Sequence, residues 1–286
     1  MTRARDIYYT STDGLALYAR DYPGPADARL NVLCLPGLTR NSRDFANLAA
    51  ALSTTYRVIC PDQRGRGRSA YDPDPSRYQP LTYVADMWAL LDHLQIHKVA
   101  IIGTSLGGIM AMVMAATRPD RIVGAVLNDI GPEIDPAGLA RIQSYVGKMA
   151  PPATWADAVA QTKALNAAIF PHMDEAHWES FTRALYREGP DGRPVLDYDP
   201  AISRNVDSGN AAPPDMWPLF DTLKATPLVV IRGGTSDILS AATMAQMRAR
   251  HPQLVTVEVP GVGHAPMLDE PEARDAIIGF LKSLPA

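Results

Sequence analysis

Residues 99–108, read Val-Ala-Ile-Ile-Gly-Thr-Ser-Leu-Gly-Gly, constrain the fold of this chain more than any other stretch. The run 99–102 is short and apolar, which is typical of a strand buried on both faces. Apolar residues beyond Gly108 have helical spacing. A Gly-x-Ser-x-Gly motif between a strand and a helix predicts a sharp turn that exposes the Ser105 hydroxyl, with the Leu106 N–H at the helix start. We therefore interpret the stretch as a nucleophile elbow, although the same motif also occurs in ordinary turns.

Strands and helices alternate along most of the chain, which predicts an α/β fold with a mostly parallel, eight-stranded sheet and helices on both faces. A turn at 11–14 predicts that the first two strands form an antiparallel hairpin. The expected strands are 7–10, 15–22, 30–35, 57–61, 99–102, 122–127, 228–232 and 254–259.

The alternation stops after Asp129 and resumes at Leu228. The residues between have helical patterns at 139–149, 155–170 and 175–188, with a turn-rich connector at 189–199 and a proline-rich return at 211–214. We expect a helical cap, 131–223, inserted between two parts of one core domain, 1–130 and 224–286.

Charge and cysteine content exclude several classes of function. A net charge of −4 gives no reason to expect nucleic acid or an anionic membrane as a partner. No apolar run reaches the length needed to span a membrane, and residues 1–10 lack a signal core. Cys34 and Cys60 fall in predicted buried strands and are interpreted as free thiols in a reducing compartment, so the expected location is cytoplasmic.

The glycine-rich loop 62–69, Asp-Gln-Arg-Gly-Arg-Gly-Arg-Ser, carries three arginines. Arginines beside glycines occur in phosphate-binding loops, but this loop has no aromatic residue and no P-loop lysine. We interpret it as a structural loop in which aspartate and arginine side chains pair.

Residues that could activate Ser105 follow two later strands. Sites in parallel sheets form at the carboxyl ends of strands, so a base and an acid are expected there. His264 follows the last strand and is the predicted base, and Asp237 follows the strand before it and is the predicted acid. Asp129, after the strand 122–127, is the rival for the acid and otherwise a hinge or pocket residue.

The elbow and the order Ser105, Asp237, His264 resemble the α/β-hydrolase family, and the resemblance extends over nearly the whole chain. The loop 62–69 is similar to a loop of that family that supports the rim of the active site. Relatives often carry His-Gly after the third strand, followed by an oxyanion donor. Here Pro36-Gly37-Leu38 stands there, so Leu38 is the expected donor together with Leu106.

The resemblance implies a serine carboxylesterase that works through an acyl-enzyme and needs neither a metal nor an organic cofactor. A lactonase or a C–C bond hydrolase using the same triad is the alternative, and a hydrolase-fold receptor without turnover is a hypothesis of another class. The expected partner is a small to medium, mostly apolar ester, with a homodimer compatible with the sequence. Residues predicted to line the substrate pocket are Trp155, Phe170, Trp178 and, if it is not the acid, Asp129.

Overall fold

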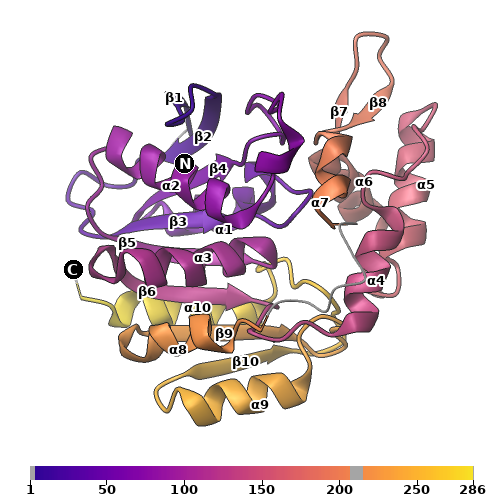
Figure 1. Cartoon of the computed structure of the whole chain (residues 1–286). Helices are drawn as coiled ribbons and strands as arrows, with labels where there is room; N and C mark the ends of the chain where they lie inside the picture. The colour runs from indigo at the N-terminus through magenta and orange to yellow at the C-terminus, as the bar shows by residue number, and fades with distance from the viewer. Residues whose placement is uncertain (1–3, 207–214, 286) are drawn as a thin grey trace.

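An eight-stranded sheet forms the centre of the computed structural model, which describes residues 4–206 and 215–285 (Figure 1). The strand order is β1-β2-β4-β3-β5-β6-β9-β10. β1 pairs antiparallel with β2 and β2 with β4, whereas all later neighbours are parallel. This confirms the predicted sheet. The strands are β1 (Arg5–Thr10), β2 (Ala16–Tyr22), β3 (Asn31–Leu35), β4 (Arg57–Asp62), β5 (Val99–Thr104), β6 (Ile122–Asn128), β9 (Leu228–Gly233) and β10 (Val255–Val259).

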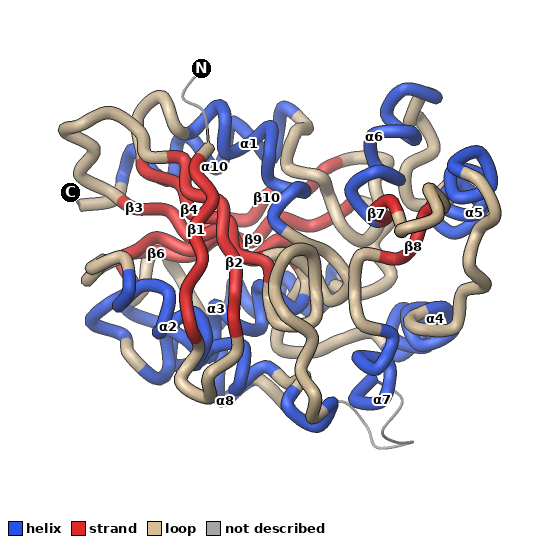
Figure 2. The backbone as a smooth tube through the Cα atoms, turned by 90° about the horizontal axis from the view of Figure 1, so that it is seen from above, coloured by secondary structure: helices blue, strands red, loops and turns tan. Residues whose placement is uncertain are grey.

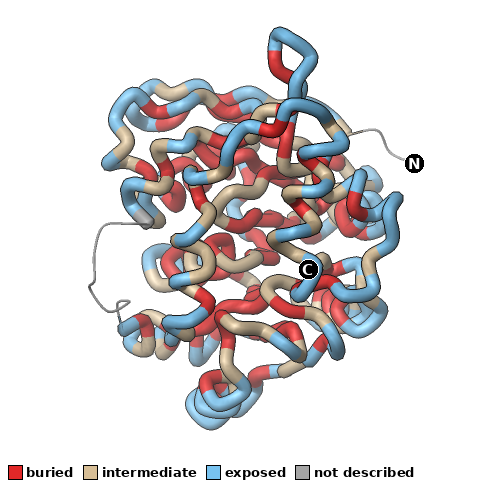
Figure 3. Tube along the Cα trace, turned by 90° about the vertical axis from the view of Figure 1, so that its right-hand side faces the viewer, coloured by how far each residue is buried: buried red, intermediate tan, exposed pale blue. Residues whose placement is uncertain are grey.

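Helices cover both faces of the sheet, with α1 and α10 on one side and α2, α3 and α8 on the other (Figure 2). Successive residues of β5 pack alternately into the two apolar cores, Ile101 into one and Ile102 into the other, because neighbouring strand residues face opposite ways. The central strands are buried and the outer helix faces are exposed (Figure 3). The helices of the core are α1 (Ala46–Leu52), α2 (Pro80–His93), α3 (Leu106–Thr117), α8 (Trp217–Asp221), α9 (Ala241–Arg250) and α10 (Pro271–Ser283).

An insertion between β6 and β9 lies at one end of the sheet, on the right of Figure 1. It contains the helices α4 (Pro136–Tyr145), α5 (Trp155–Asn166), α6 (Glu175–Leu185) and α7 (Ser203–Val206), and a hairpin of β7 (Tyr186–Glu188) and β8 (Pro194–Leu196). Short 3-10 turns join elements throughout: η1 (Ser42–Phe45), η2 (Pro75–Arg77), η3 (Pro119–Arg121), η4 (Pro200–Ile202) and η5 (Thr222–Ala225).

The hairpin corrects two expectations about the insertion. The helix predicted over 175–188 ends at Leu185, and the residues expected to be a connector supply β8. A three-residue strand carries too few alternating positions to be distinguished from a helix end by its pattern. The predicted return at 211–214 lies outside the described residues.

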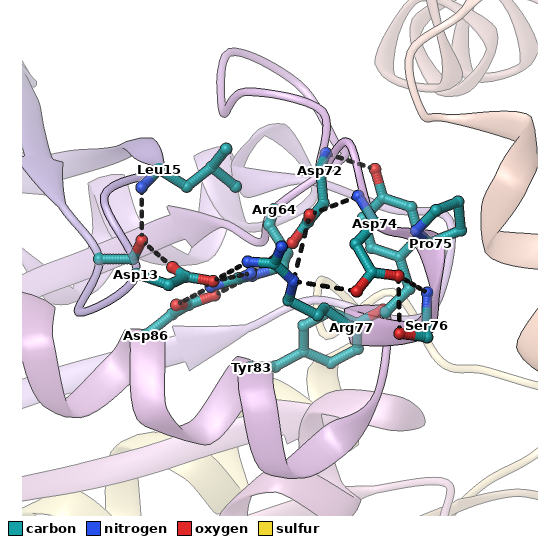
Figure 4. Close-up of polar contacts among 12 residues, drawn as sticks. Asp13, Leu15, Arg64, Asp72, Asp74, Pro75, Ser76, Arg77, Tyr83 and Asp86 are labelled. Carbon is teal, nitrogen blue, oxygen red and sulfur yellow. Dashed lines mark hydrogen bonds and ion pairs between the residues drawn. The ribbon is translucent and has the colours of Figure 1, made fainter.

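The loop after β4 is held by a buried arginine, as predicted (Figure 4). The Arg64 guanidinium donates to Asp86 at 2.6 and 2.7 Å, to Asp72 at 2.5 Å and to Asp13 at 2.8 and 3.0 Å. The side chains of Arg64, Asp72 and Asp86 are each only 1% exposed. A buried charge is costly unless it is paired, so these ion pairs hold together. They connect the loop to the β1–β2 turn through Asp13 and to α2 through Asp86.

Both cysteines are free thiols and buried, as the sequence predicted. Burial raises the pKa of the Cys60 thiol well above its usual value, so it stays protonated and unreactive. Within the described residues, no helix is both long and apolar enough to cross a membrane.

Candidate active site

Ser105 stands on the turn between β5 and α3, with backbone φ of 52° and ψ of −116°. A left-handed backbone is uncommon for a residue other than glycine and is found where surrounding structure enforces it. The turn is tight because β5 and α3 approach closely. A Cβ on Gly107 would lie 2.0 Å from the Leu35 carbonyl oxygen, and one on Gly103 would lie 2.3 Å from the Gly107 oxygen. The sequence therefore needs both glycines to place Ser105 here.

His264 contacts the serine from the loop that follows β10. Its Nε2 lies 2.9 Å from Ser105 Oγ, and its Nδ1 lies 2.8 Å from Oδ2 of Asp129. The imidazole is 9% exposed, so one edge is open to the site while the rest is enclosed. With Nδ1–H donating to the carboxylate, Nε2 is left as an acceptor for the serine proton.

Asp129 follows β6 directly and is fully buried. Besides the histidine, its carboxylate accepts hydrogen bonds from the Gly233 N–H at 2.8 Å and the Ser236 hydroxyl at 2.6 Å. Ser236 in turn accepts from the N–H groups of the two residues at 238 and 239, which fixes its rotamer. The negative charge is thus fully hydrogen-bonded, as a buried carboxylate requires.

Asp237 does not orient His264, which corrects the predicted choice of acid. Its carboxylate instead pairs bidentately with Arg141 of α4, at 2.5 and 2.8 Å. The Arg141 guanidinium holds the pKa of Asp237 below its usual value. The reason is positional: Asp129 leaves the end of β6 beside the histidine, whereas Asp237 lies four residues beyond Gly233, against the insertion.

A cavity of about 280 Å³ opens above the serine. Ser105 and His264 line it, together with residues 36–40 of the loop after β3. The insertion contributes Tyr145, Phe170 and Phe181 to its wall.

Only part of the predicted pocket lines this cavity. Phe170 does, but Trp178 is buried within the small core of the insertion, and Trp155 stacks against Arg183 with its ring centroid 4.4 Å from the guanidinium carbon. Asp129 lies behind His264 and not in the wall. The apolar face of a helix can pack into the core of the insertion or line the cavity, and the spacing of aromatic residues does not distinguish the two.

The backbone amide of Leu38 belongs to the loop after β3, and that of Leu106 begins α3 directly after Ser105. Neither N–H donates a hydrogen bond to another described residue. The loop that carries Leu38 is held by the loop after β4, because the buried Arg66 donates from Nε to the Leu38 carbonyl at 2.8 Å. Gln63 similarly donates to the Pro36 carbonyl at 3.2 Å.

Two features of the site were missed at the level of sequence. Ser236 was overlooked because it precedes the predicted acid, although a hydroxyl next to a strand end is a common partner of a carboxylate. Arg40 also lines the cavity, and no sequence motif pointed to it. Within the described residues, no group of three or more His, Cys, Asp and Glu side chains is placed to hold a metal ion.

Comparison with known proteins shows the family of this chain. Residues 31–271 match the family described as alpha/beta hydrolase fold. The chain is 36% identical over 262 residues to a 3-hydroxybutyrate-oligomer hydrolase of Cupriavidus necator, covering 88% of this chain and 87% of that one. It is 28% identical to a 2-(acetamidomethylene)succinate hydrolase of Mesorhizobium japonicum, covering 82% and 81%.

Among solved structures, an alpha/beta hydrolase from Novosphingobium aromaticivorans superposes with a TM-score of 0.93. That protein is 47% identical, and the match covers 99% of each chain. The family model and these relatives match almost the full length of the chain. The chain therefore belongs to the α/β-hydrolase family.

Proposed function

We propose that this chain is a serine hydrolase that cleaves carboxylic esters through an acyl-enzyme. The observation that carries the proposal is the continuous relay from Ser105 Oγ through His264 to the Asp129 carboxylate, with both hydrogen bonds shorter than 3.0 Å. A serine hydroxyl becomes a competent nucleophile when a base accepts its proton and a third group orients that base.

In the proposed mechanism, His264 Nε2 takes the Ser105 proton as Oγ attacks the ester carbonyl. The N–H groups of Leu38 and Leu106 stabilise the oxyanion, and Asp129 stabilises the imidazolium. His264 then protonates the departing alkoxide. A water molecule, deprotonated by the same nitrogen, attacks the acyl-enzyme and releases the acid.

The substrates that this proposal favours are short esters. The cavity accommodates a small to medium group, and its wall is partly aromatic. The relative from Cupriavidus necator carries a name that refers to oligomers of a hydroxy acid, which are linked by esters. We include such oligoesters in the proposed substrate range.

Steady-state hydrolysis of p-nitrophenyl acetate, butyrate and octanoate tests the proposal. We expect saturable turnover by the native chain, a preference for the shorter acyl groups, and loss of turnover in Ser105→Ala. Ser283→Ala is the matched control, because it removes an exposed hydroxyl at the end of α10 and should leave the rate unchanged.

Turnover that survives in Ser105→Ala would refute the assignment of the nucleophile. If the native chain hydrolyses no ester, the same relay would instead be tested on lactones and on substrates with a cleavable C–C bond.

A further inference from the structure

Arg40 lies beside the nucleophile, in the loop after β3. A Cβ added to Gly37 would lie 3.5 Å from Arg40 Cγ and 3.8 Å from Ser105 Cβ, so the two side chains flank this glycine. The Arg40 side chain is 15% exposed, and it lines the same cavity as Ser105. Nothing in the mechanism above uses it.

The guanidinium of Arg40 is fixed on two sides. Its Nε and Nη2 donate to the two oxygens of Asp44, each at 2.6 Å. The ring of Phe181 packs against its face, with the centroid 4.3 Å from the guanidinium carbon. A bidentate pair together with a stacked ring holds a planar guanidinium in one orientation.

One nitrogen of this group remains available. Nη1 donates no hydrogen bond to a described residue. It is also not fully buried, so a ligand can reach it. A donor that is already held in position loses little conformational entropy when it binds a ligand oxygen. Asp44 balances the charge, so the site offers a directed hydrogen bond more than a free cation.

We propose that Arg40 is a specificity-determining residue that selects esters carrying a second oxygen acceptor a few bonds from the scissile carbonyl. Esters of hydroxy acids have such an acceptor, either as a terminal carboxylate or as the carbonyl of the next ester. This inference rests on the proposed ester hydrolysis, and it adds which esters are preferred.

A purely structural role for Arg40 leads to a different expectation. If the Arg40–Asp44 pair only braced the loop that carries Leu38, its loss would reduce the rate on every ester in the same proportion. The selection proposed here instead changes the ratio between substrates, because only an ester with a second acceptor loses a hydrogen bond.

Three esters of butyric acid separate these roles. In the first, the alcohol part is 3-hydroxybutyrate with a free carboxylate. In the second, it is the methyl ester of 3-hydroxybutyrate. In the third, it is a branched alcohol of equal size with no second oxygen. For the native chain we expect kcat/KM to be about tenfold to a hundredfold higher on at least one oxygen-bearing ester, the range of one hydrogen bond to a charged group. A gain on the carboxylate alone identifies an anion as the acceptor, whereas an equal gain on the methyl ester identifies a carbonyl.

In Arg40→Gln we expect this preference to fall to about unity, because kcat/KM falls by a larger factor on the oxygen-bearing ester than on the hydrocarbon ester. Arg40→Lys keeps the charge but not the planar guanidinium with its several N–H donors, so it should lose most of the preference as well. Asp44→Asn keeps the guanidinium but loosens it, and should lower the preference partially.

Binding measured by calorimetry on the Ser105→Ala chain provides a readout that does not depend on turnover. The free-carboxylate and methyl esters should each be tested, and the one that the native chain prefers should bind about tenfold more weakly when Arg40→Gln is added. Equal losses on all three substrates, or unchanged binding, would overturn the role of Arg40. Failure of the proposed function is a separate outcome, namely no hydrolysis of any of the three esters by the native chain.

Discussion

Asp129→Asn should disable catalysis while leaving the fold in place. Asparagine has nearly the same shape, but the Asp129 carboxylate accepts from the Gly233 N–H, the Ser236 hydroxyl and His264 Nδ1. An amide has only one oxygen to share among these donors, and its NH₂ group would face the Nδ1–H of the histidine. The imidazole would then favour the tautomer that cannot accept the serine proton.

The corresponding change in a serine protease triad lowers kcat about 10⁴-fold, or about 5 kcal/mol of transition-state stabilisation. We expect a loss on the order of 10³–10⁴ in kcat on p-nitrophenyl butyrate. Asp237→Asn is the matched control, because it makes the same chemical change one loop away and breaks only the pair with Arg141. Its kcat should stay within about tenfold of the native value.

Circular dichroism and thermal melting of both variants exclude unfolding as the cause of any loss. The reasoning would be refuted if Asp237→Asn lost activity by the larger factor and Asp129→Asn kept most of it.

Other predictions concern the framework of the site. Arg64→Leu leaves the buried Asp86 without its cation and Asp72 with only Arg77 at 3.6 Å (Figure 4), and it should lower the free energy of unfolding by about 3–5 kcal/mol, measured by urea denaturation. Hydrogen bonds from Arg64 hold the pKa of Asp13 below its usual value, so the stability from this pair is present above the unfolded pKa and is lost as the pH falls. Melting temperatures taken from pH 5 down to pH 3 should therefore decline more for the native chain than for Asp13→Asn. Gly107→Ala places a Cβ 2.0 Å from the Leu35 carbonyl oxygen and should reduce both ester turnover and the melting temperature.

The fold could be read from the sequence because its signals are local and agree with one another. Apolar runs such as 99–102 and 228–232 predicted buried strands, and helical spacing between them predicted parallel neighbours. Ser105 and His264 came from the same logic, since both follow strands whose carboxyl ends meet at one edge. The sequence also predicted that aspartate and arginine side chains pair in the loop 62–69, as Arg64 does, but it did not indicate which aspartates take part or that Arg66 would bind backbone carbonyls and Tyr83 instead.

The acid could not be chosen on the same grounds. β6 and β9 are adjacent, so both Asp129 and Asp237 emerge near the histidine, and the choice depends on loop geometry that spacing does not encode. A signal was present in Ser236, whose hydroxyl holds the carboxylate of Asp129, but its meaning depends on which aspartate faces it.

The insertion was the hardest part to predict because its elements are short. Its hairpin strands have three residues each, and tertiary contacts decide whether such a segment is extended. The same holds for its aromatic residues: Phe170 and Phe181 face the cavity, whereas Trp155 packs against Arg183.

Covalent labelling of the nucleophile tests directly whether Ser105 is the activated serine. The native chain would be treated with a fluorophosphonate that phosphonylates activated serines, and the site located by intact-mass and peptide mass spectrometry. We expect one adduct per chain, on the peptide that contains Ser105, and no adduct in Ser105→Ala or His264→Ala. Labelling at another serine, or equal labelling of His264→Ala, would contradict it.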